Sequence, residues 1–134
     1  MAISYTVDAR HRIVWATFFE SVTTDEMRQY FAAVERDGGH DPSFAHVVDW
    51  RDLASLPSEF EVHELAQLIL MSVARRGGLN RRALLVRPGV QYGVARMLQI
   101  LLDETDGLAE LQLFADLESA REWVRSPRSE ASAA

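Results

Sequence analysis

The feature of this sequence that most limits its fold is the alternation of short apolar runs with longer stretches of helical periodicity. Residues 3–7 and 13–19 are two strand-like runs joined by a short polar connection, which is typical of a β-hairpin. Further strand-like runs at residues 45–50, 82–86 and 111–114 alternate with helical stretches. This alternation predicts right-handed crossovers and a mostly parallel sheet, to which the first strand adds antiparallel.

The starts of the predicted helices are marked by capping residues. Thr23 with Glu26, and Ser58 with Glu61, match the capping-box pattern, in which two side chains satisfy backbone amides reciprocally. Asp116 is a suitable cap for the last helix. We therefore predict an α/β fold with a five-stranded mixed, mostly parallel sheet and about four helices.

Length and composition favour one globular domain. The chain has 134 residues, of which 48% are hydrophobic, enough for a single core without disulfides or a structural metal. We expect residues 1–125 to form the domain and the small, polar residues 126–134 to form a disordered tail. The N-terminus does not resemble a secretory signal, and the longest apolar stretch, residues 65–74, is too short to span a membrane. The expected location is the cytoplasm, with no transmembrane segment.

Charge and residue usage exclude several function classes. With 14 basic and 20 acidic residues the net charge is -6, which opposes binding to nucleic acid. The absence of cysteine excludes thiol nucleophiles, thiolate zinc sites and disulfides. All the basic residues other than histidine are arginine, so lysine Schiff bases and the lysine of a P-loop are excluded as well.

Three stretches, residues 41–51, 92–97 and 114–124, together with the element order, resemble the small bacterial proteins of the SpoIIAA-like fold. These are relatives of the STAS domains of anti-sigma-factor antagonists and of sulfate-transporter tails, and the resemblance covers about residues 3–125. It implies a non-enzymatic regulatory or protein-interaction module with a protein partner. The antagonists carry a phosphorylated serine in a segment that corresponds to residues 52–58, where Ser55 and Ser58 lie here without the Asp-Ser-Ser-Gly pattern.

Polar residues near the carboxyl ends of the predicted parallel strands form a candidate ligand site. Asp49 and Arg51 lie at the end of the third strand, and Tyr92 and Arg96 lie near the start of the third helix. Ligands of open α/β sheets favour this edge, and arginine with free helix amides suits a small anion. Two alternatives are a structural ion pair between Asp49 and Arg96, and an enzyme that uses Asp49 as base and Arg96 as anion clamp.

The second predicted helix is apolar over more than one face. Beyond its main stripe, Phe60, Leu68 and Met71 extend the apolar arc, and this surplus needs a cover. The cover is a neighbouring helix, a second copy of the chain in a homodimer, or an apolar ligand. The last option describes a carrier or sensor of a small apolar or anionic ligand, with a pocket between the helices that contain Leu65 and Met97.

Motifs for metals, cofactors and nucleophilic catalysis are absent from the sequence. No pair of the four histidines has the spacing of a metal site, and His40 and His46, with Asp41 between them, are six residues apart. No serine lies in a G-x-S-x-G motif, and no glycine run matches a nucleotide-binding loop. We therefore predict no metal, no cofactor and no catalytic residue.

Overall fold

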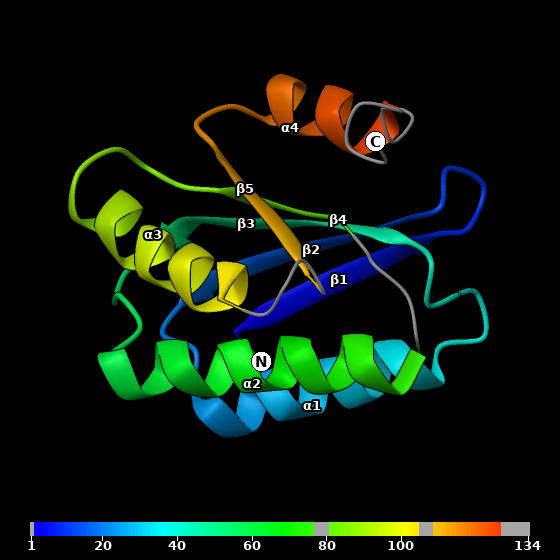
Figure 1. The fold of residues 1–134 in the computed structure, drawn as a ribbon, viewed down its shortest axis with the longest axis horizontal. Coiled ribbons are helices and arrows are strands. Elements are labelled where there is room, and N and C mark those ends of the chain that lie inside the picture. The colour runs from blue at the N-terminus through cyan, green and yellow to red at the C-terminus, as the bar shows by residue number, and fades with distance from the viewer. Residues whose placement is uncertain (1, 77–80, 105–108, 127–134) are drawn as a thin grey trace.

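The computed structural model describes residues 2–76, 81–104 and 109–126 and has the predicted order of elements (Figure 1). In chain order they are β1 (Ile3–Asp8), β2 (Ile13–Glu20), α1 (Thr24–Arg36), β3 (Ala45–Leu53), α2 (Glu59–Arg76), β4 (Arg81–Leu85), α3 (Val90–Asp103), β5 (Glu110–Phe114) and α4 (Leu117–Arg125). The predicted tail, residues 127–134, lies outside the described residues. None of the helices in the described part of the chain is long and apolar enough to cross a membrane.

The five strands form one sheet in the order β1-β2-β3-β4-β5. β1 is antiparallel to β2, and every other neighbouring pair is parallel, which confirms the predicted mixed sheet. Val47 and Val48 pair with Ala83 and Leu84, as expected for neighbouring parallel strands. Because the parallel strands follow one another in chain order, right-handed crossovers place α1, α2 and α3 on one face of the sheet. Figure 1 shows α4 on the opposite face.

The two faces of the sheet have separate apolar clusters. The larger cluster lies under α1, α2 and α3 and includes Phe18, Trp50 and Leu84. The smaller cluster lies under α4, where Ala120 packs with Val47 and other residues of the central strands. Alternation along each strand sends successive side chains to opposite faces, so one strand serves both clusters.

The helices begin at the predicted caps. Thr23 accepts a hydrogen bond from the Glu26 amide at 3.1 Å, and the Glu26 carboxylate accepts one from the Thr23 amide at 3.1 Å. Ser58 and Glu61 form the same reciprocal pair at the start of α2. Asp116 accepts a bond from the Ser119 amide at 2.8 Å. These bonds satisfy amides that have no partner within the helix.

α2 lies between α1 and α3 and packs against both helices. Leu68 is partly buried against the larger core. Phe60 and Met71 differ, because their side chains remain 65% and 54% exposed. The structure therefore covers only part of the surplus apolar arc.

Candidate functional site

The structure does not bring the four residues of the predicted ligand site together. Asp49 lies on the face of the sheet that carries α4, as does Val47 two residues earlier. Its carboxylate binds the Arg51 guanidinium twice, at 3.0 and 2.9 Å, and this pairing raises the pKa of Arg51. Tyr92 and Arg96 are exposed on α3, whose inner residues pack on the opposite face. Arg96 donates to Gln99, so the Asp49–Arg96 ion pair is not formed.

The two serines considered for phosphorylation have different surroundings. Ser55 is exposed in the connection between β3 and α2. Ser58 is also exposed, but its hydroxyl accepts the Glu61 amide at 3.1 Å as the cap of α2. A phosphate on Ser58 would replace this capping bond, whereas Ser55 has no comparable role.

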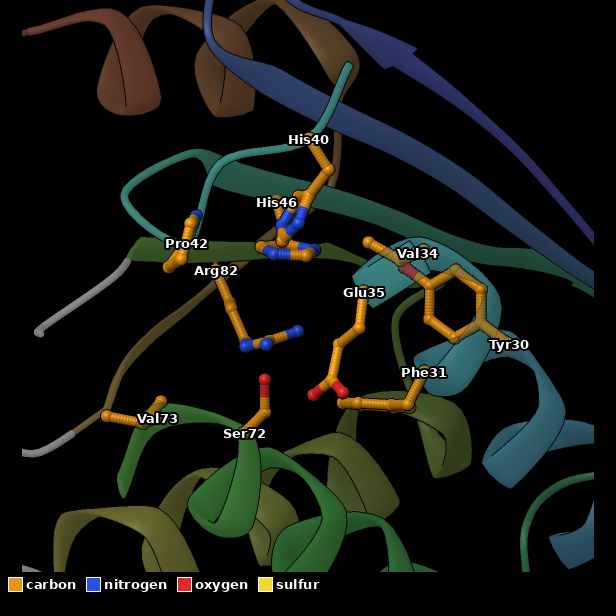
Figure 2. Close-up of a pocket in the computed structure, with 10 residues that line it drawn as sticks. All are labelled: Tyr30, Phe31, Val34, Glu35, His40, Pro42, His46, Ser72, Val73 and Arg82. Carbon is orange, nitrogen blue, oxygen red and sulfur yellow. The ribbon is translucent and has the colours of Figure 1, made fainter. Parts of the chain in front are cut away.

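A pocket lies instead near the amino ends of β3 and β4, under α1 and α2 (Figure 2). His46 and Arg82 occupy the same register position on these adjacent strands and project into it. Ser72 of α2 and Glu35 of α1 line the same pocket, as Figure 2 shows. The remaining lining residues are Tyr30, Phe31, Val34, His40, Pro42 and Val73.

Arg82 is the most unusual residue of this pocket, because its side chain is charged and almost fully buried. It is 3% exposed, and burial lowers its pKa to about 10, so it remains protonated at neutral pH. The guanidinium carbon lies 5.5 Å from the centre of the Phe31 ring. Within the described ranges, no carboxylate lies within ion-pair distance of Arg82, and its Nε has no hydrogen-bond partner. Buried charges usually have such a partner.

His46 lies beside Arg82 as a neutral imidazole. Burial, reinforced by the positive charge of Arg82, holds its pKa well below the usual 6.5. Its Nδ1 is buried and has no partner among the residues described. The ring centre lies 6.1 Å from that of His40, so the two histidines do approach each other. The described residues nevertheless contain no group of three metal-ligating side chains.

Tyr30 supplies a second neutral polar group on the wall of the pocket. Its ring packs edge-on against Phe18 and Phe31, with ring centres 5.9 and 5.3 Å apart. Burial raises the pKa of Tyr30 to about 12, so its hydroxyl keeps its proton at neutral pH. This hydroxyl also has no hydrogen-bond partner in the part of the chain that the structure describes. Arg82, His46 and Tyr30 therefore offer polar atoms that the fold itself does not use.

A second cavity adjoins the first and is mainly apolar. The two share three lining residues: Tyr30, Phe31 and Arg82. Beyond them, the second cavity lies between the sheet, α2 and α3 and is lined by Phe18, Val48, Trp50, Leu65, Ile69, Ala83, Leu84, Leu98 and Leu111. For a carrier or sensor, the pocket predicted from the sequence lies between the helices that contain Leu65 and Met97; Leu65 lines this cavity, whereas Met97 does not.

The sequence does contain a signal for this site, which is the alternation of inward and outward side chains along β3 and β4. Arg82 precedes Leu84 and Val86 at spacings of two, and those two residues belong to the larger core. His46 has the same relation to Val48 and Trp50. A charged or polar residue in phase with a buried apolar series is expected to point toward the core. These two residues lie near the amino ends of β3 and β4, whereas the ligand site predicted from the sequence lies at the carboxyl ends.

No protein-family model, curated protein or solved structure matches this chain. Its relation to the SpoIIAA-like group therefore stays a prediction from the residues quoted above.

Proposed function

We propose that this protein is a non-enzymatic binding protein, a carrier or sensor, for a small molecule with an anionic group. The ligand occupies the pocket at the amino ends of β3 and β4, with its anionic group on Arg82. His46 and Tyr30 contribute neutral hydrogen-bonding groups beside the guanidinium.

The observation that carries this proposal is the buried guanidinium of Arg82. A charge removed from water is costly unless it is paired, and the cost is justified where the charge serves binding. Arg82 is 3% exposed, and no carboxylate in the described residues lies within ion-pair distance. Phe31 offers a cation–π contact but no counter-charge. An anion entering the pocket would supply the missing charge and form charge-assisted hydrogen bonds.

The pocket favours binding over catalysis. At neutral pH, His46 is unprotonated and Tyr30 is protonated, so both act as hydrogen-bonding groups with strongly perturbed proton affinities. A general acid or base works best when its pKa lies near the working pH, and these two lie on opposite sides of it. The enzyme alternative based on Asp49 and Arg96 has no common site, because the sheet separates the two residues.

The test is acetate titration of the full-length protein, followed by calorimetry and by NMR of the arginine Nε–H resonances. Acetate is expected to shift the Arg82 signal of the wild type saturably, and the heat of acetate binding is expected to disappear in Arg82→Met. Arg96→Met, which removes an exposed arginine on α3, is the matched control and should bind acetate as the wild type does. Equal binding by Arg82→Met and the wild type would overturn the proposal.

A second candidate function is the regulatory or protein-interaction role that the sequence resemblance implies. The observation that favours it is a stripe of exposed apolar residues on α3, formed by Val90, Met97 and Ile100. These residues recur at helical spacing on one face, and exposed apolar patches often mark interfaces. Sedimentation would detect a homodimer, and a Met97→Glu/Ile100→Glu variant should lose any self-association or partner retained by the wild type. Unchanged association would exclude this stripe as the interface.

A further inference from the structure

We infer that the ligand is a short-chain organic monocarboxylate, whose carboxylate binds Arg82 and whose apolar body fills the adjoining cavity beside Trp50 and Leu98. This inference rests on the proposed function, because it identifies the ligand class of the same site. It adds a requirement that simple anion binding does not have, namely an apolar group of limited size.

The charges at the pocket select a single negative charge. Arg82 is one cation, and a carboxylate matches its planar fork with two parallel hydrogen bonds. His46 and Tyr30 are neutral, while Glu35 brings a carboxyl group to the same pocket. A phosphate dianion would bring more negative charge than one guanidinium offsets, close to Glu35 and away from water. A monocarboxylate adds the least negative charge beside the one buried cation.

The second cavity selects an apolar group next to the carboxylate. Tyr30, Phe31 and Arg82 line both cavities, so a carboxylate on Arg82 places its next atoms at their shared boundary. The side chains beyond that boundary are aliphatic or aromatic, including Leu65, Ile69 and Leu98. Small-molecule sites commonly combine such an apolar lining with a few convergent polar groups.

The volumes of the cavities limit the length of that apolar group. The volume is about 20 Å³ for the polar cavity and about 30 Å³ for the apolar cavity. On the same measure, one water-sized group needs about 10–15 Å³. The carboxylate and about two or three further carbons therefore fit without rearrangement, whereas an octanoate chain does not.

Isothermal titration of the full-length protein with acetate, butyrate, pentanoate and octanoate tests this inference. Affinity is expected to rise roughly fourfold for each added methylene from acetate to butyrate, as burial of apolar surface predicts, and to fall again by octanoate. In a Trp15→Phe/Trp123→Phe background, Trp50 is the remaining tryptophan and lies on the cavity. Butyrate should change its fluorescence, while acetate should leave it nearly constant.

Two variants separate the tail site from the head site. Leu98→Phe fills the apolar cavity and is expected to reduce the affinity for butyrate at least tenfold while acetate binding persists. Ile69→Ala enlarges the cavity and is expected to move the optimum to a longer chain, which provides a test if Leu98→Phe does not fold. Acetate binding at Arg82 with no dependence on chain length would overturn the inference alone. No binding of any of these acids at Arg82 would overturn the proposed function as well.

Discussion

His46 and Arg82 are partners across the parallel ladder of β3 and β4, and both are buried on the face that α1 and α2 cover. Two basic side chains in this position would repel each other if both were charged. Burial and the charge of Arg82 keep His46 neutral, so the pocket carries one cation with a polar, uncharged neighbour. The groups around His46 are Arg82 from β4, Tyr30 and Glu35 from α1, and His40 from the preceding loop.

The neutral state of His46 predicts a pH dependence of stability. Its pKa is lower in the folded than in the unfolded chain, so the unfolded chain binds an extra proton as the pH falls below about 6.5. The free energy of unfolding should therefore fall with decreasing pH, with a slope of up to about 1.4 kcal/mol per pH unit. Chemical denaturation of His46→Gln between pH 7 and 5 should show a flatter slope. His63→Gln, an exposed control on α2, should keep the slope of the wild type; identical slopes in all three would contradict this account.

Removal of negative charge at Glu35 is expected to strengthen anion binding. Glu35 lines the same pocket as Arg82, and Glu35→Gln replaces its carboxyl group by a neutral amide. The affinity for acetate should increase by roughly threefold to tenfold in a partly screened environment. Titration calorimetry measures this, with Glu59→Gln at the exposed start of α2 as control. A weaker affinity in Glu35→Gln would show that Glu35 assists the ligand.

Ser58 and Ser55 are expected to differ in their contribution to stability. Ser58→Ala removes the side chain that caps α2 and should lower the free energy of unfolding by about 1 kcal/mol. Ser55→Ala should change it by less than about 0.5 kcal/mol, because Ser55 is an exposed loop residue. Urea denaturation of both variants gives the comparison, and an equal loss would contradict the assigned capping role.

Two glycines near the start of α3 give predictions of opposite sign. Gly89 has a φ of 92° and a ψ of -135°, a conformation that side chains rarely adopt, so Gly89→Ala should cost about 1–3 kcal/mol. Gly93 lies within α3, and an added Cβ would meet nothing within 4 Å. Gly93→Ala should therefore raise stability by about 0.5–1 kcal/mol. Thermal denaturation would contradict the described start of α3 if the two changes had the same sign.

The fold followed from local patterns because each pattern has a local physical cause. The pairs Thr23/Glu26 and Ser58/Glu61 mark helix starts through bonds between residues three apart, and the apolar runs at 47–48 and 84–86 identify central strands. Chain order and the handedness of crossovers then determine which strands are neighbours.

The site could not be predicted from local patterns in the same way, because it depends on which face of the sheet each side chain occupies. The order of elements places Asp49 and Arg96 near the same edge of the sheet. The alternation of side chains along β3, however, puts Asp49 on the face that α4 covers. Arg82 and His46 are distant in sequence, and their shared register position became known only from the pairing of β3 with β4. The volumes of the cavities depend on side-chain packing between helices, which the sequence does not specify locally.

The proposed role of Arg82 is to bind an anion, and its burial lowers the stability of the fold. Arg82→Met in the unliganded protein tests this role, by urea denaturation and acetate titration of the same preparation. Removal of a buried cation whose pKa burial lowers to about 10, less the lost contact with Phe31, should raise the free energy of unfolding by about 1–3 kcal/mol. Acetate binding should disappear.

Arg81→Met is the matched control from the neighbouring position, because the Arg81 guanidinium binds the backbone carbonyls of Trp123 and Ser126 at 2.9 and 2.8 Å. This variant should lose stability and retain acetate binding. If Arg82→Met instead lost stability as Arg81→Met does, or still bound acetate, Arg82 would be a structural residue and the proposed site would be contradicted.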